Sequence, residues 1–167
     1  MNSNIAELVT RYRGRGAVVD TNLFLVLLLG NVDPRLIGNT ARTDGYSAAD
    51  YDLLREVLEQ FARIVILPQI LTEAGNLLKR NCRYPNTLLD LHDELARIIH
   101  FAQTKESSVS AKRATLHPAY HALGYADAAI LAAANGRYLL LTADGPLQNM
   151  AWSSGVDVLP FDWLKHS

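Results

Sequence analysis

The sequence predicts an α/β fold, a three-layer sandwich in which helices cover both faces of a parallel sheet of four or five strands. Short apolar runs typical of strands recur along the 167 residues, helical patterns separate them, and no linker or repeat divides the chain. Strands that alternate with helices in this way are typical of βαβ units, whose strands run parallel. We therefore expect a single domain over residues 1–167, with residues 1–16 as a basic lead-in segment.

Four short apolar runs are the expected strands. They cover residues 17–20, 64–67, 138–142 and 156–159. Apolar runs of this length without strict alternation indicate strands that are buried on both faces, as in a parallel sheet. Pro68 and Pro160 directly follow two of the runs and should end them, because proline has no backbone N–H for the sheet.

The longest apolar stretch predicts a buried helix. Nearly every residue of 22–29 is apolar, which indicates a helix that is covered on most sides. Gly30 should end this helix as a C-terminal cap. Residues 31–46 are polar and contain glycine and proline, so we expect a long loop there.

Other helices begin at recognisable signals. Ser47, with Asp50 three residues later, resembles a capping box. Pro68 and Pro85 suit the first turn of the helices that follow them. Further helices are expected over residues 116–123, 124–134 and 147–152.

Composition indicates a soluble cytoplasmic protein. The net charge is -1, so charge alone does not predict nucleic-acid binding. The single cysteine, Cys82, excludes an internal disulfide, and no apolar run approaches the roughly 20 residues that span a membrane. Arg11, Arg13 and Arg15 precede the first strand and form either a flexible entry segment or an arm that contacts phosphate.

Four acidic residues are expected to meet at one edge of the sheet. Asp20 ends the first strand, and Asp144 follows the third strand by two residues. Glu73 lies early in the helix that leaves the second strand, and Asp127 lies in the first turn of the helix before the third strand. The carboxyl ends of parallel strands lie at one edge, where ligands bind. We therefore expect the four carboxylates to converge there.

Converging carboxylates indicate a metal site. Like charges in one cleft repel one another and raise each other's pKa unless a cation compensates them. Mg²⁺ and Mn²⁺ prefer oxygen ligands, and such ions can activate water and neutralise a phosphodiester. Each acid also has a structural interpretation: Asp20 could cap a helix, Glu73 could lie on the surface, Asp127 could favour a helix dipole, and Asp144 could form a turn.

The segments that carry these acids, taken in order, resemble those of the PIN-domain family, which includes many prokaryotic toxin ribonucleases of the VapC type. The resemblance extends over residues 17–159, nearly the whole chain. It is carried by four segments in the family's order, which are residues 18–22, 67–78, 125–134 and 140–144.

The resemblance implies a PIN-like fold and a metal-dependent endoribonuclease, the toxin of a type II toxin–antitoxin pair. It implies Mg²⁺ or Mn²⁺ as cofactor, RNA as substrate, a homodimer, and an antitoxin that occupies the acidic cleft. No membrane contact is expected, because the apolar runs are too short to span a bilayer. The residues to which it assigns roles are the metal ligands Asp20, Glu73, Asp127 and Asp144, and the orienting residues Asn22 and Thr142. The chain departs from the family in its greater length and in having no basic residue beside Asp144.

Other functions stay open from the sequence. A catalytically silent PIN-like module that binds RNA or protein is favoured by the long loop and by the lack of basic residues near Asp144. A phosphatase with Asp20 as nucleophile would need a second Asp where Asn22 stands. The chain has no GxxxxGK[ST] loop, and His117 and His121, spaced as in some zinc sites, have no evident third ligand.

Overall fold

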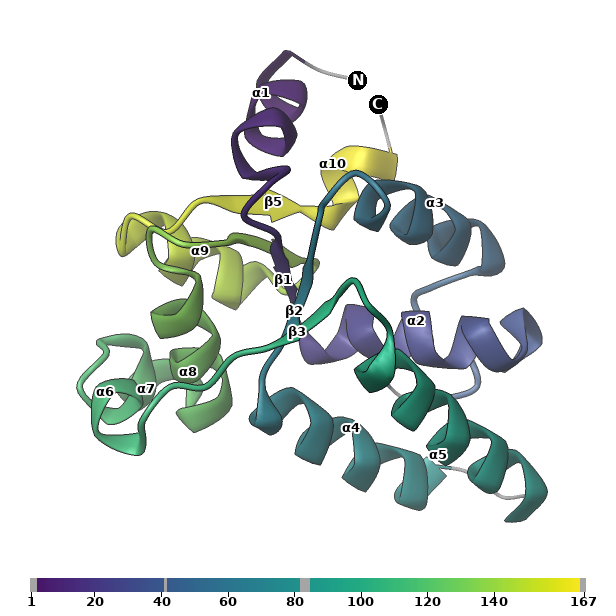
Figure 1. The fold of residues 1–167 in the computed structure, drawn as a ribbon. Coiled ribbons are helices and arrows are strands. Elements are labelled where there is room, and N and C mark those ends of the chain that lie inside the picture. The colour runs from purple at the N-terminus through teal and green to yellow at the C-terminus, as the bar shows by residue number, and fades with distance from the viewer. Residues whose placement is uncertain (1–2, 41, 82–84, 166–167) are drawn as a thin grey trace.

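Five parallel strands form one sheet through the middle of the molecule (Figure 1). The computed structural model describes residues 3–40, 42–81 and 85–165, so Cys82 lies outside the described residues. The strand order is β3-β2-β1-β4-β5. The strands are β1 (Ala17–Val19), β2 (Ile64–Ile66), β3 (Thr104–Glu106), β4 (Leu139–Thr142) and β5 (Val158–Pro160).

Helices cover both faces of this sheet, which confirms the predicted α/β class. Figure 1 shows α2 to α5 on one side and α6 to α8 on the other. The helices before β3 are α1 (Ser3–Tyr12), α2 (Thr21–Val32), α3 (Ala48–Leu58), α4 (Pro68–Asn81) and α5 (Pro85–His100). Those after β3 are α6 (Ala111–Thr115), α7 (Ala119–Leu123), α8 (Tyr125–Ala134), α9 (Gly145–Ser153) and α10 (Phe161–Lys165). No helix in the described part of the chain is long and apolar enough to cross a membrane.

Helix α2 is the centre of one helical layer. It contacts α3, α4 and α5, and its residues from Leu23 to Gly30 are all buried. The all-apolar sequence thus has neighbours on every side, as expected for a helix without a polar face. At about 25 cal/mol per Å² of buried apolar surface, such a helix is a main source of stability for the domain.

The expected end of α2 at Gly30 is wrong. The helix continues to Val32, and Asp33 is its C-cap. Gly30 serves packing instead, because a Cβ at this position would overlap the ring of Tyr51 on α3. The Tyr51 hydroxyl then donates a hydrogen bond of 2.8 Å to Asn31 Oδ1. The glycine therefore marks a close approach of two helices rather than a helix end.

The first sixteen residues are not a simple lead-in segment. They contain α1, whose buried residues Ile5, Val9 and Tyr12 pack into the core. Arg11 forms ion pairs with Glu7 and Asp157 at 3.0 and 3.1 Å. This segment leads into the amino end of β1, so it lies at the opposite end of the strand from Asp20.

Several other elements differ from the sequence prediction. Strand β3 was not expected, because its residues are polar and half-exposed or exposed at the sheet edge. The segment expected as a loop over residues 31–46 contains the end of α2 and a 3₁₀ helix, Pro34–Leu36, and Ile37 and Thr43 are buried. Of the helix expected over residues 116–123, only α7 (residues 119–123) forms, because Pro118 has no backbone N–H to continue a helix from the preceding residues. Helix α6, which ends at Thr115, was not expected. Strand β5 includes Pro160.

The predicted capping signals are confirmed. Ser47 and Asp50 make both hydrogen bonds of a capping box at the start of α3. Pro68 and Pro85 are the first residues of α4 and α5. These local signals position α4, which carries Glu73, directly after β2.

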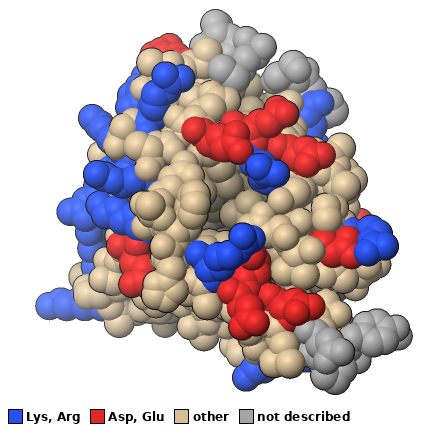
Figure 2. Space-filling view, turned by 45° about the vertical axis from the view of Figure 1, so that its right-hand side comes forward, with Lys and Arg blue, Asp and Glu red and all other residues tan. Residues whose placement is uncertain are grey.

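Charged residues on the surface are locally separated although the net charge is small. Figure 2 shows Lys and Arg gathered along one edge of the face that it draws, with Asp and Glu in separate patches. This separation is not complete, because exposed ion pairs such as Arg35–Asp33 at 2.7 Å and Arg55–Glu59 at 3.3 Å place opposite charges in contact. Pairs of this kind contribute little to stability.

The packing of Tyr51 against Gly30 leads to a stability prediction. Gly30→Ala should lower the free energy of unfolding by about 1–3 kcal/mol, because the added methyl group forces the buried ring to move. Gly75→Ala on α4 is the control, since no atom lies within 4 Å of the Cβ it would add. The control should raise stability by about 0.5–1 kcal/mol. Urea unfolding measures both, and equal effects of the two substitutions would contradict the account.

Candidate active site

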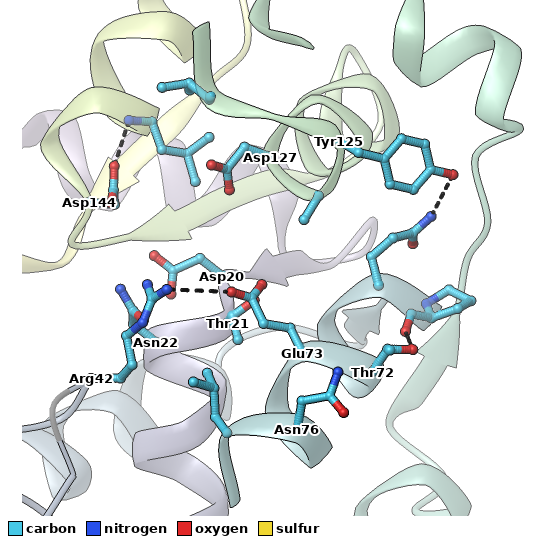
Figure 3. Close-up of a pocket in the computed structure, with 16 residues that line it drawn as sticks. Asp20, Thr21, Asn22, Arg42, Thr72, Glu73, Asn76, Tyr125, Asp127 and Asp144 are labelled. Carbon is cyan, nitrogen blue, oxygen red and sulfur yellow. Dashed lines mark hydrogen bonds and ion pairs between the residues drawn. The ribbon is translucent and has the colours of Figure 1, made fainter. Parts of the chain in front are cut away.

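The four predicted acids line one cavity of about 790 Å³ at the carboxyl edge of the sheet. Figure 3 shows Asp20, Glu73, Asp127 and Asp144 around this cavity, each from a different element. Strands β2, β1 and β4 are neighbours, so the segments that leave their carboxyl ends start side by side. The topology therefore brings together acids that are separated by more than a hundred residues in sequence.

Asp20 is the most buried of the four, with 4% of its surface exposed. Its carboxylate is held at both oxygens, because Leu23 N donates 2.8 Å to Oδ1 and the Thr142 hydroxyl donates to Oδ2. Burial raises the pKa of Asp20 to about 6, although both hydrogen bonds favour the charged form. The nearby Asp144 carboxylate raises the pKa further. Asp20 thus caps α2, as the structural interpretation had it, and also lines the cavity.

Asp127 lies in the first turn of α8, opposite Asp20 and Glu73 across the cavity (Figure 3). Burial is the main cause that raises its pKa to about 6, and the charges of Asp144, Glu73 and Asp20 add to it. Repulsion from three carboxylates on three other elements means that all four share one electrostatic environment.

Glu73 is held by Thr21, the residue directly after Asp20. The hydroxyl of Thr21 donates a 3.0 Å hydrogen bond to Glu73 Oε2. The guanidinium of Arg42 lies 3.7 Å from Glu73 Oε1, across the mouth of the cavity. Glu73 is therefore not a free surface residue of α4.

Asp144 and Asp20 are linked through one buried hydroxyl. Asp144 caps α9 by accepting a 2.8 Å hydrogen bond from Leu147 N, and its own backbone N–H donates 3.0 Å to Thr142 Oγ1. Thr142 is fully buried at the end of β4 and donates to Asp20. Thr142 does not line the cavity, but its hydroxyl orients the Asp20 carboxylate from the buried side.

Asn22 lines the cavity beside Asp20. Its Oδ1 is buried and has no hydrogen-bond partner among the described residues. Buried polar atoms nearly always have a partner, so this oxygen is a remaining acceptor next to the carboxylates.

Six polar residues of the cavity wall were not predicted from the sequence, and these are Thr21, Arg42, Gln69, Thr72, Asn76 and Tyr125. Arg42 comes from the segment between α2 and α3, where no motif marks it. Gln69 and Tyr125 face each other, and Gln69 Nε2 donates 3.3 Å to the Tyr125 hydroxyl. Tyr125 is 37% exposed. A signal for Tyr125 and Gln69 was present, since each lies within four residues of a predicted acid.

The oxygen atoms of the four carboxylates and of the Asn22 amide suit Mg²⁺ or Mn²⁺, which bind carboxylate and amide oxygens. The unpartnered Asn22 oxygen and the mutual repulsion of Asp20 and Asp127 both favour a cation here. Within residues 3–40, 42–81 and 85–165, no three His, Cys, Asp or Glu side chains are close enough to hold one ion together. A binding mode with one or two direct carboxylates and several waters, which is usual for Mg²⁺, fits this open arrangement.

His117 and His121, which are spaced as in some zinc sites, have ordinary structural roles. His117 Nδ1 accepts a 3.1 Å hydrogen bond from Ala119 N, and the His121 ring packs edge-on against Tyr120. They belong to no metal-binding group among the described residues.

No protein-family model matches this chain, and no curated protein matches its sequence. The resemblance to PIN domains therefore depends on the four acidic segments and on the parallel sheet that brings them together.

The raised pKa of Asp127 leads to a prediction on pH. The pKa of Asp127 is about 6 in the folded protein, against 3.8 for an ordinary Asp carboxyl in the unfolded chain. The folded state therefore binds the proton more tightly, which stabilises it at low pH, and this contribution is lost as pH rises through 6. Asp127→Asn removes the titration, so relative to wild type this variant should gain stability between about pH 4 and pH 7. Urea unfolding in the presence of a chelator measures this difference. A difference that does not change with pH would contradict the electrostatic description.

Proposed function

We propose that this protein is a metal-dependent endoribonuclease with a PIN-like domain. The main support is the shared cavity at the carboxyl edge, which four carboxylates line. The resemblance to VapC-type proteins supports RNA as substrate, the role as the toxin of a type II pair with an antitoxin, and a homodimeric state. The proposed cytoplasmic location follows from the composition, which includes a single cysteine.

The proposed chemistry divides between a bound ion and the residues of the chain. Mg²⁺ or Mn²⁺, when bound, would activate a water molecule and neutralise the phosphodiester. Asp20, fixed at both oxygens, would be the anchoring ligand, with Asp144 beside it. Glu73, which Thr21 holds, would complete the acidic wall.

Asp127 is suited to move a proton. Its pKa of about 6 lies near neutral pH, so the carboxylate is mostly ionised there and is still basic enough to accept a proton from water. Asp20 has a similar pKa but is constrained by the Thr142 and Leu23 hydrogen bonds. The two acids therefore suit different roles, one as ligand and one as base.

A catalytically silent module that binds RNA or protein is the second candidate. It is favoured because no three acidic side chains of the described residues converge on one point. Calorimetric titration with Mn²⁺ separates the two candidates, since a silent module needs no ion. A phosphatase with Asp20 as nucleophile is less well supported, because Asn22 stands where such an enzyme needs a second Asp.

Cleavage of a labelled single-stranded RNA in millimolar Mn²⁺ tests the proposal. Asp20→Asn and Asp127→Asn should each lower the rate by at least about a hundredfold, since even residues that only support metal ligands contribute ten- to a hundredfold. Asparagine can still cap α2, so the fold should persist, as circular dichroism would show. Asp52→Asn, on the exposed side of α3, is the matched control and should leave the rate unchanged. Equal cleavage by all the variants would refute the assignment.

A further inference from the structure

Arg42 is the only Lys or Arg among the described residues that line the cavity. It lies at the mouth, on the segment between α2 and α3, and its side chain reaches toward Glu73 (Figure 3). The adjacent Thr43 is fully buried, and its hydroxyl contacts that of Thr40 at 2.9 Å. The backbone under Arg42 is therefore anchored, while the side chain itself extends into the opening.

The ion pair between Arg42 and Glu73 is the loosest of those between described residues. Its N–O distance is 3.7 Å, against 2.6 Å for Arg97–Glu94. A separation of 3.7 Å is too long for a hydrogen bond, and the two side chains are 50% and 35% exposed. Exposed pairs of this kind are worth about 0–1 kcal/mol, so the Arg42 guanidinium can leave Glu73 at little cost. Glu73 would keep its hydrogen bond from Thr21.

The charge of the cavity gives this guanidinium a role in substrate binding. Four carboxylates and one guanidinium leave a formal charge of -4 + 1 = -3 when all are ionised. A phosphodiester is an anion, so it can enter such a cavity only beside a cation. The guanidinium of arginine is a planar fork of hydrogen-bond donors that can bind two phosphate oxygens at once. At 3.7 Å, the Glu73 carboxylate accepts no hydrogen bond from this fork.

We propose that Arg42 binds a phosphodiester group of the substrate strand, and that it exchanges Glu73 for phosphate oxygens when the strand enters. This inference rests on the proposed nuclease function and adds the residue that would position the strand at the carboxylates. Arg42 is thus a substrate-binding residue at the cavity mouth. In the free protein, Glu73 is its resting partner.

Binding of a labelled single-stranded RNA to the Asp127→Asn protein, measured by fluorescence anisotropy at several salt concentrations, tests the role of Arg42. Adding Arg42→Ala should weaken binding about tenfold and lower the slope of log K against log salt by about 1, as for loss of one phosphate contact. Arg42→Lys should retain part of the affinity. Arg55→Ala is the matched control, because Arg55 is 51% exposed and pairs with Glu59 at 3.3 Å on α3. The control should leave affinity and slope unchanged.

Three outcomes would overturn the inference. Unchanged affinity and slope in Arg42→Ala would mean that Arg42 does not contact phosphate. Tighter binding would mean that Arg42 acts only as an internal counter-ion that blocks the cavity, and no measurable binding by the Asp127→Asn parent would remove the site altogether. Failure of the nuclease proposal is separate, since it would appear as unchanged RNA cleavage in Asp127→Asn, whatever the result for Arg42.

Discussion

Repulsion between carboxylates that the fold holds in one cavity is the constraint on which this structure depends. Asp20 and Asp127 both have a pKa near 6, and each is raised by burial and by the other acids. The ionised cluster opposes folding at neutral pH, and the rest of the domain must offset that cost. A protein keeps such an arrangement where the charges are needed for function, which is why perturbed carboxyls mark candidate sites.

The fold offsets the repulsion by fixing the acids on well-packed elements. Asp20 connects β1, whose three residues are buried, to α2, whose residues from Leu23 to Gly30 are buried. Thr142 at the end of β4 supplies a hydrogen bond to Asp20 and accepts one from the backbone of Asp144. Two capping interactions and one shared hydroxyl therefore hold Asp20 and Asp144 in place. Among the described residues that line the cavity, Arg42 alone carries a positive charge, and its ion pair with Glu73 is long, at 3.7 Å.

The sheet and the acidic site could be predicted because their signals are local. Buried parallel strands read as short apolar runs, and each acid follows such a run or starts a helix at the same edge. Strand β3 could not be found in this way, since Thr104–Glu106 is polar and its pairing with β2 is a tertiary contact. Gly30 was misread because a glycine that admits the Tyr51 ring looks the same in sequence as one that ends a helix. Arg42 had no signal, because its place at the cavity depends on how residues 31–46 fold over α2.

We propose above all that these carboxylates line one cavity because they bind a divalent cation. An anomalous-difference map from crystals grown with millimolar Mn²⁺ tests this claim most directly. The account predicts a peak in the cavity at about 2.0–2.2 Å from a carboxylate oxygen of Asp20, with other ligands from the neighbouring acids or from water. A map with no peak in this cavity, or with Mn²⁺ bound only elsewhere on the protein, would contradict it.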